Sequence, residues 1–282
     1  MSPLRKRLIE DLQLAGYSNR TVECYASVVV RLSSHFKRSP DKISDEELRQ
    51  FFLYLKNERK VSDSSFKQYA TGIKFFFERT LDRQWDLFDL ARPDKSRRLP
   101  FCISHEEVKV LLGLVRSYEC RIALKTIYAC GLRLSEATNL RVKNIDGQRR
   151  MLQVVQGKGK KDRNLPIPSR LLEHLREYWK QDRPKDYLFV SSRNRNLPMG
   201  GNRLQKVFKK VVRESGSVHQ QATIHTLRHS YATRLLENGI NIKQLKELLG
   251  HSSISTTLRY THITAVAEQN VRETLDHLMS DL

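Results

Sequence analysis

Helical periodicity dominates this sequence and limits the folds that it can adopt. Apolar residues recur every three or four positions in one segment after another, which is typical of amphipathic helices that bury one face. One segment differs: MLQVVQGKGKKDRNLPIP has two β-rich runs around a Gly- and Lys-rich turn and predicts a hairpin. We therefore expect a mainly α protein with a small β-hairpin, an α+β fold, and a length of 282 residues favours two domains.

Residues 1–90 are expected to form the first domain, a small helical bundle. SNRTVECYASVVVRLSSHF, ISDEELRQFFLYLKNE and SSFKQYATGIKFFFERT each carry an apolar stripe at helical spacing. Ser18 is a candidate N-cap for the first of these helices, and Ser44 with Glu47 forms a capping-box pattern at the start of the second. Because the aromatic residues lie on the stripes, we interpret them as core residues rather than platforms for stacking bases.

A basic linker is predicted at residues 91–100. This segment, ARPDKSRRLP, holds two prolines, four positive charges and few apolar residues. Residues 101–282 are then expected to form a second, mostly helical domain that opens with a capping-box pattern from Ser104 to Glu107. Gly131 is a candidate for the residue that ends one of its helices, and the predicted hairpin interrupts the helical order.

The net charge narrows the class of partner. Lys and Arg number 51 and Asp and Glu 31, which gives a formal net charge of +20 at pH 7. A balance this basic indicates a polyanionic partner, either nucleic acid or an anionic membrane surface. Membrane binding would concentrate the charge in a tail or in one amphipathic helix, whereas here it is spread over the chain. The pattern favours a protein that binds a phosphate backbone, with a merely solvated basic face as the alternative.

The sequence predicts neither a membrane-spanning segment nor a metal site. No window approaches the roughly 18 apolar residues of a membrane span, and MSPLRKRLIEDL lacks the apolar region of a secretory signal. Cys24, Cys102, Cys120 and Cys130 form no CxxC pair and show no ligand spacing, so we expect reduced thiols. The sequence therefore predicts a cytoplasmic protein without a bound metal or cofactor.

The segment HTLRHSYATRLLENG carries a candidate phosphate-binding pair. His225 and Arg228 stand three positions apart and so lie on one helix face, where an imidazole and a guanidinium suit the oxygens of a phosphate. Taken alone, the motif is better explained as a surface pair without a function. His229 stands four positions from His225, so a zinc site is a third interpretation, but the HExxH glutamate and a recognisable third ligand are missing.

Further candidate site residues lie in three other segments. LLGHSSISTTLRYTH ends a helix at Gly250 and places His251 on the following loop, nine positions before Tyr260. Tyrosine can act as a nucleophile if its proton has an acceptor. GLRLSEATNL places Arg133 at the start of a short helix, where backbone N–H groups and a guanidinium can face one anion. Lys158 adds a long cationic side chain at the tip of the predicted hairpin.

In this order, GLRLSEATNL, GKGKKDRNLPIP, HTLRHSYATRLLENG and LLGHSSISTTLRYTH closely resemble the motifs of the tyrosine recombinases or phage-type integrases, particularly the compact Xer-like members from bacteria. The resemblance covers nearly the whole chain. It implies a helical, SAM-like core-binding domain that binds DNA at residues 1–90. It also implies a catalytic domain at residues 101–282, whose C-terminal helix passes between protomers.

The resemblance also implies a role for each site residue. The implied catalytic residues, with Glu136 in support, are Arg133, Lys158, His225, Arg228, His251 and the nucleophile Tyr260. Tyr260 would attack a DNA phosphorus, expel the 5′-hydroxyl and form a 3′-phosphotyrosyl link. Lys158 would protonate the leaving oxygen, with Lys160 and Lys161 as alternatives. His225 would help to deprotonate Tyr260, and His251 would donate a hydrogen bond to the phosphate.

The implied function is site-specific DNA recombination without ATP, metal or cofactor, in DNA integration, excision or transposition, by a homotetramer on two double-stranded DNA sites. The last segment carries an apolar stripe of Val271, Leu275 and Leu278, which either folds back on its own domain or docks on a neighbouring subunit. The alternatives are a non-cutting DNA-binding relative, a type IB topoisomerase and a zinc hydrolase built on His225 and His229.

Overall fold

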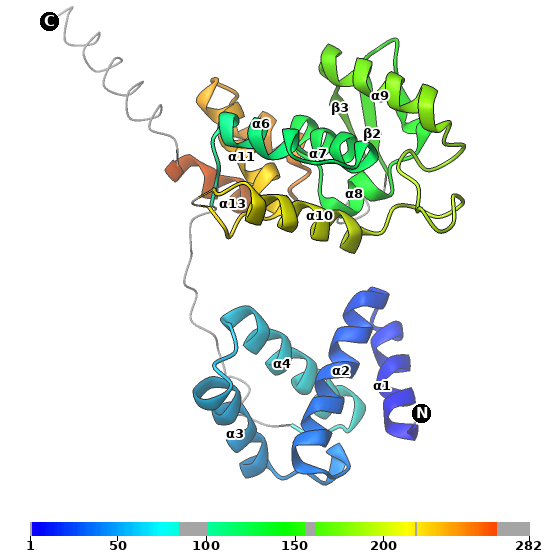
Figure 1. The fold of residues 1–282 in the computed structure, drawn as a ribbon. Coiled ribbons are helices and arrows are strands. Elements are labelled where there is room, and N and C mark those ends of the chain that lie inside the picture. Colours follow the sequence, from blue (N-terminus) through cyan, green and yellow to red (C-terminus); the bar gives the residue numbers. More distant parts are fainter. Residues whose placement is uncertain (1, 85–100, 156–161, 218, 264–282) are drawn as a thin grey trace, which may run out of the picture. The chain divides into compact units, whose positions relative to one another are not determined.

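The computed structural model of the protein separates into two compact units, Met1–Arg97 and Arg98–Leu282 (Figure 1). It describes residues 2–84, 101–155, 162–217 and 219–263. The predicted linker at 91–100, Lys158 and the C-terminal apolar stripe lie outside these residues. The domain boundaries at 90 and 100 therefore stay a prediction.

The described part of the first unit is helical, as predicted. Helix α2 lies between α1 and α4 and packs against both (Figure 1). The elements are α1 (Pro3–Leu14), α2 (Asn19–Phe36), the 3-10 turn η1 (Pro40–Lys42), α3 (Asp45–Leu53), the π-helical turn η2 (Tyr54–Glu58), α4 (Asp63–Phe75) and the π-helical turn η3 (Phe76–Thr80).

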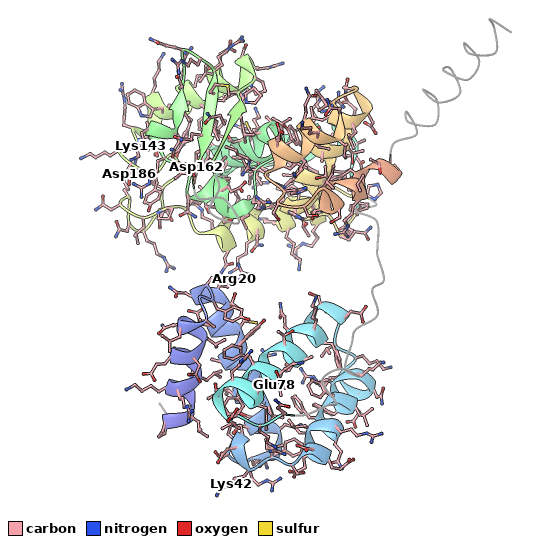
Figure 2. All side chains as sticks on the ribbon, turned by 180° about the vertical axis from the view of Figure 1, so that it is seen from behind. Arg20, Lys42, Glu78, Lys143, Asp162 and Asp186 are labelled. Atoms are coloured by element: carbon pink, nitrogen blue, oxygen red, sulfur yellow. The ribbon has the colours of Figure 1, made fainter. Side chains whose placement is uncertain are left out.

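Caps and an aromatic core hold the first unit together. Ser18 caps α2 by accepting a hydrogen bond from the Thr21 N–H, and Ser44 and Glu47 form the predicted capping box of α3. The predicted apolar stripes meet in one core, while charged side chains such as Arg20 and Lys42 lie on the surface (Figure 2). The buried aromatic residues of this core are Phe51, Phe52, Tyr69, Phe76 and Phe77, with Tyr25 and Phe66 partly buried against them.

The second unit is mostly helical with one small sheet. Its helical elements are α6 (His105–Gly113), α7 (Tyr118–Cys130), α8 (Leu134–Thr138), the 3-10 turn η4 (Val142–Asn144), α9 (Ser169–Asp182), α10 (Gly201–Glu214), α11 (Ile224–Glu237), α12 (Ile242–Leu249), α13 (Ile254–Thr257) and the 3-10 segment η5 (Leu258–Ile263). Over the described residues, every helix is too short or too polar to span a bilayer.

The predicted hairpin is present and is part of a three-stranded sheet. Strands β2 (Met151–Val154) and β3 (Arg163–Pro166) pair antiparallel, with Leu152 opposite Leu165. A third strand, β1 (Ile145–Asp146), pairs with the other edge of β2. We did not predict β1, because two residues are too few to show the alternation by which strands are recognised. The fold class expected from the sequence is confirmed.

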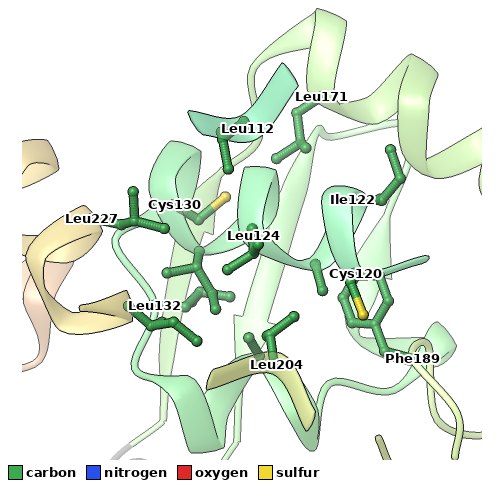
Figure 3. Close-up of a cluster of buried hydrophobic side chains, with 14 of the residues drawn as sticks. Leu112, Cys120, Ile122, Leu124, Cys130, Leu132, Leu171, Phe189, Leu204 and Leu227 are labelled. Carbon is green, nitrogen blue, oxygen red and sulfur yellow. The ribbon is translucent and has the colours of Figure 1, made fainter. Parts of the chain in front are cut away.

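Helix α7 lies in the middle of the second unit and is buried on several sides (Figure 3). Its side chains Ile122, Leu124 and Ile127 are at most 1% exposed. The side chains that surround them come from α6, α9, α10, α11 and the sheet, and include Leu112, Leu171, Leu204, Leu227 and Leu152. This burial fixes the end of α7, and with it the start of the candidate site.

The four cysteines are free thiols. Cys120 and Cys130 are completely buried in the core of the second unit, where desolvation raises the pKa of the Cys130 thiol to about 12. Cys24 and Cys102 are half-buried. Buried, protonated thiols of this kind are packing groups rather than reactive ones.

Candidate active site

Arg133 is positioned by the sharp turn that ends α7. Gly131 adopts a left-handed conformation with φ of +59°, and a Cβ atom there would lie 2.4 Å from the ring of Tyr231, so the turn requires glycine. The Arg133 side chain donates from Nη1 to Glu136 Oε1 (2.7 Å) and from Nη2 to the Gly250 carbonyl (3.1 Å). Its backbone N–H donates to Glu136 Oε2 (2.8 Å), so in this structure it serves the carboxylate of Glu136 and not a bound phosphate.

Glu136 is the buried centre of the arginine cluster. It is only 5% exposed, and Arg163 binds it at two points, Nη1 to Oε1 at 3.0 Å and Nη2 to Oε2 at 2.8 Å. Arg228 Nη1 lies 3.8 Å from Oε2. Burial alone would raise the pKa of this carboxyl, but hydrogen bonds and positive charge from Arg163 and Arg133 lower it to about 2. Glu136 is therefore ionised at neutral pH and offsets part of the surrounding positive charge.

Arg163 is a site residue that our sequence analysis missed. It lies at the start of β3, in the predicted hairpin, where we considered only lysines as candidate site residues. The signal was available, because Arg163 alternates with Leu165 and Ile167 and so belongs to the apolar face of the predicted strand. A charged residue on a buried strand face needs a partner of opposite charge, and here that partner is Glu136.

Arg228 is almost fully buried, at 1% exposure. It donates from Nη1 to the Gly131 carbonyl (2.6 Å) and from Nη2 to the Leu249 carbonyl (2.6 Å), and Nη2 also lies 3.2 Å from His251 Nε2. Desolvation by burial, followed by the charge of Arg133, lowers the pKa of Arg228 to about 10. The guanidinium is still charged at neutral pH, and the ends of α7 and α12 hold it in place.

Three consecutive carbonyls at the end of α12 each accept a hydrogen bond from a different arginine. The Leu248 carbonyl accepts from Arg163 Nε (2.9 Å), while those of Leu249 and Gly250 accept from Arg228 and Arg133. The last carbonyls of a helix lack partners within the helix and carry its negative dipole end, which suits guanidinium groups. The end of α12 therefore gathers three arginines into one cluster, one from the residue before α8, one from β3 and one from α11.

His251 follows this helix end and is hydrogen-bonded on both ring nitrogens. Nδ1 lies 2.9 Å from the Thr257 hydroxyl, and Nε2 faces Arg228, which can only donate. Nε2 therefore carries no proton here, and the ring donates through Nδ1. Burial, followed by the charges of Arg228 and Arg133, lowers the pKa of His251 to about 4. The predicted hydrogen bond from His251 to a phosphate stays a prediction, since both nitrogens are occupied in this structure.

Tyr260 lies in η5 with its ring buried at 3% exposure. The ring packs in a small cluster with Ala232 of α11 and with Leu245 and Leu249 of α12. Its hydroxyl lies 2.8 Å from Nδ1 of His229. Burial raises the pKa of this hydroxyl, and the positive charges of Arg228, Arg259 and Arg133 offset part of that effect.

His225 lies one helical turn before His229 and keeps an exposed surface. The two rings meet edge to face, with their centroids 4.4 Å apart. Desolvation lowers the pKa of His225, and the charges of Arg228 and Arg133 lower it further. The hydrogen-bond partner of the Tyr260 hydroxyl is His229 rather than His225, to which the sequence analysis gave the task of deprotonating the tyrosine.

The structure brings the described candidate residues into one region. The arginine cluster includes Arg133, Glu136 and Arg228, and His251 links it to the tyrosine, since the rings of His251 and Tyr260 stack at 6.4 Å and 7°. Lys158 lies outside the described residues. In the described parts of the chain, no group of three or more His, Cys, Asp and Glu side chains could hold a metal ion. The site thus combines cations, imidazoles and a phenol, a composition suited to phosphodiester chemistry.

Comparison with known proteins identifies this combination of fold and site. Residues 102–266 match the phage integrase family, and residues 4–87 match the N-terminal SAM-like domain of phage integrases. The tyrosine recombinase XerA of Pyrococcus furiosus is 33% identical over 93% of this chain and 91% of its own length. The chain therefore belongs to the phage integrase family of tyrosine recombinases. The predicted enzyme class and the predicted site-specific recombinase function are confirmed.

A second relative and a solved structure are also similar to this chain. The putative integrase/recombinase y4qK of Sinorhizobium fredii is 38% identical over 93% of this chain and 85% of its own length. The fold is similar to that of lambda integrase bound as a dimer to a COC′ core site, with a TM-score of 0.74, 20% identity and coverage of 90% of this chain and 95% of the other. At this identity the last comparison shows the fold alone.

Proposed function

We propose that this recombinase cleaves and rejoins double-stranded DNA through a covalent 3′-phosphotyrosyl link to Tyr260. The observation that carries the proposal is the buried Tyr260 hydroxyl, hydrogen-bonded to an imidazole in the field of Arg228 and Arg133. The net charge of +20 supports a DNA backbone as the partner. Structural neighbours bound to DNA, such as the lambda integrase dimer on its core site, support the same partner.

The arginine cluster supplies the positive charge that the reaction needs. Attack on a phosphodiester places additional negative charge on the non-bridging oxygens, and preorganised donors stabilise this charge. Arg133 uses two guanidinium N–H groups in its described contacts, and an arginine has five, so donors remain for a phosphate. Arg228 is 1% exposed, so its assigned contact with the phosphate requires that it become accessible when DNA binds. Glu136 supports the site by accepting a hydrogen bond from Arg133, which fixes the orientation of that arginine.

The remaining assigned roles complete the reaction. The 5′-oxygen leaves as a strong base and must be protonated, a task that the proposal gives to Lys158 as general acid. His251 is assigned a hydrogen bond to the phosphate, and His225 is assigned a part in the deprotonation of Tyr260. The arginines stand where other phosphoryl-transfer enzymes use divalent ions, so the proposed reaction needs no metal. It needs no ATP, because the phosphotyrosyl ester conserves the energy of the broken bond.

The proposal extends to assembly and location. A C-terminal helix bearing Val271, Leu275 and Leu278 would dock on a neighbouring protomer and give a homotetramer on two DNA sites. Tyr260 lies close before this segment in the chain, so docking would couple the position of the nucleophile to assembly. The protein would act in the cytoplasm, in DNA integration, excision or transposition.

A covalent-trapping experiment tests the proposed function. The protein is incubated in EDTA with supercoiled plasmid carrying the DNA that flanks its own gene, and in parallel with a genomic library, and is then quenched in detergent. We expect a nucleotide adduct on the peptide that contains Tyr260, identified by mass spectrometry, and none with Tyr260→Phe, which lacks only the nucleophilic oxygen. Tight binding without an adduct on either DNA would contradict the proposal and favour a non-cutting DNA-binding protein.

Exchange assays on the captured DNA then separate the two cutting alternatives. Reciprocal joining of two captured sites supports recombination, whereas relaxation of supercoils without joining of sites indicates a type IB topoisomerase. An adduct that forms in a parallel incubation without EDTA, but not in EDTA, would indicate a metal-dependent reaction instead.

A further inference from the structure

His229 is the hydrogen-bond partner of the nucleophilic hydroxyl, and no role has been assigned to it so far. It lies on α11 directly after Arg228, and its Nδ1 stands 2.8 Å from the Tyr260 oxygen. The two rings are tilted by 51° with centroids 5.5 Å apart, so the contact is made through the ring nitrogen and not by stacking. A candidate proton acceptor must first lie within hydrogen-bonding reach of the proton, and His229 does.

The protonation state of His229 fits an acceptor. Burial, followed by the charges of His225, Arg228 and Arg259, lowers the pKa of His229 to about 4, so the ring is neutral at pH 7. A neutral imidazole has one bare nitrogen. Among the described contacts Nδ1 of His229 is the one acceptor within reach of the Tyr260 hydroxyl, so the tautomer with a bare Nδ1 allows this hydroxyl to donate its proton to the ring.

The same charges favour the ionised tyrosine. Arg228, Arg259 and Arg133 all lower the pKa of the Tyr260 hydroxyl against the effect of burial. When a DNA phosphate binds beside these arginines, its negative charge offsets theirs at the histidine ring. The proton affinity of the ring therefore rises as substrate arrives. The groups that face His229 are then His225 and Arg228 of α11 and Arg259 and Tyr260 of η5.

We propose that His229, rather than His225, takes the proton of Tyr260 during DNA cleavage. In this step the Oη–H bond of Tyr260 breaks and its proton passes to Nδ1 of His229. At the same time the Oη–P bond forms and the bond from phosphorus to the 5′-oxygen breaks, and the 5′-oxygen takes a proton from the general acid assigned above. The inference rests on the proposed function, because it assumes that Tyr260 is the nucleophile.

A matched pair of substitutions tests this role. His229→Asn keeps a polar atom near the position of Nδ1 but cannot take up a proton at neutral pH. The control is His105→Asn, because His105 Nδ1 makes the same kind of contact with the Tyr128 hydroxyl (3.1 Å) outside the site. Both are compared with wild type in single-turnover cleavage of the DNA captured by the wild-type protein, with Tyr260 either natural or replaced by a fluorinated tyrosine, whose phenol is more acidic.

We expect His229→Asn to slow cleavage about 100-fold or more at neutral pH, the usual contribution of a general base. The loss should shrink as the pH rises and when Tyr260 is fluorinated, because a tyrosine that ionises on its own no longer needs an acceptor. His105→Asn should cleave at the wild-type rate. His225→Asn should also slow cleavage, but fluorination should restore little of that loss.

Three results would overturn the inference. The first is a cleavage rate for His229→Asn within about threefold of wild type, and the second is a loss of rate that fluorination of Tyr260 leaves unchanged. The third is faster cleavage by His229→Asn than by wild type, which would mean that His229 restrains the tyrosine. If His229→Asn binds DNA poorly or unfolds early, His229→Gln with the fluorinated tyrosine provides the second comparison. An absent wild-type adduct contradicts the proposed function, whereas a wild-type adduct with an unaffected His229→Asn contradicts only this inference.

Discussion

Arg163 and Glu136, 27 positions apart in the chain, form a two-point ion pair, with nitrogen–oxygen distances of 3.0 and 2.8 Å. The side chains are 10% and 5% exposed. The pair joins β3 to α8, and Arg163 also binds the end of α12 through the Leu248 carbonyl. Because Glu136 also accepts a hydrogen bond from Arg133, the orientation of an arginine proposed to bind the phosphate depends on a residue that is assigned no contact with DNA.

Arg163→Ala should therefore destabilise the second unit and reduce cleavage. Removing one partner of a buried ion pair costs about 3–5 kcal/mol in the free energy of unfolding, since the other charge stays buried. Urea denaturation, monitored by the fluorescence of Trp179 in proteins that all carry Trp85→Phe, measures this free energy of unfolding. Lys210→Ala, which breaks the exposed 3.7 Å pair with Glu214, should cost less than about 1 kcal/mol. Equal effects of the two substitutions would contradict the role given to Arg163.

Gly131→Ala should also damage the site. The left-handed φ of +59° and the Tyr231 ring 2.4 Å from the added Cβ predict a loss of about 1–3 kcal/mol in stability. The Gly131 carbonyl binds Arg228, so we also expect weaker cleavage. Gly113→Ala is the matched control, because its Cβ would meet nothing within 4 Å at a helical position and should be neutral or slightly stabilising. Thermal unfolding and adduct yield of both variants check this, and a stable, active Gly131→Ala would refute it.

Acid should destabilise the protein through His229 and His251 before most carboxylates titrate. The pKa of each is lowered from 6.5 to about 4, so the folded protein binds these protons less strongly than the unfolded chain. Their contribution to stability is complete above about pH 6.5 and is lost as the pH falls towards about 4. Urea unfolding at about pH 7.5 and about pH 5 measures it. The double variant His229→Asn, His251→Gln should show a smaller difference between the two pH values, and an unchanged difference would count against the two histidines.

Lys158→Ala should slow cleavage by about 100-fold or more if this lysine is the general acid. Replacing the 5′-leaving oxygen of the DNA by sulfur should largely restore the rate, because a thiolate leaves without a proton. Single-turnover cleavage of the two DNAs by each variant measures the rescue. Failure of sulfur to rescue Lys158→Ala, with rescue of Lys160→Ala or Lys161→Ala, would move the role to that lysine.

Local sequence signals predicted the helices and their ends well, because these depend on nearby residues. The capping boxes at Ser44 and Ser104 and the glycine end of α7 are present as expected. The apolar stripes likewise pack in the cores. Strand β1 was missed, since its two residues become a strand only by pairing with β2.

The residue types of the site were predictable, but their contacts were not. The sequence does not show whether His225 or His229 contacts the tyrosine. The packing of η5 against α11 brings His229 within hydrogen-bonding distance of the Tyr260 hydroxyl. The burial of Arg228 and the role of Arg163 likewise depend on carbonyls of residues 248–250, which no side-chain motif reveals. Backbone acceptors carry no residue-type signal, so contacts of this kind are found only in the folded structure.

The three carbonyls at the end of α12 also bear on how this protein is made. A chain emerges from the ribosome from its N-terminus, so Arg133, Arg163 and Arg228 are synthesised before the helix end that gathers them. Until residue 250 is available, these arginines lack the acceptors that hold them together, and Tyr260 follows later still. A chain that ends after residue 228 but before residue 248 therefore contains all three arginines but none of the carbonyls that gather them.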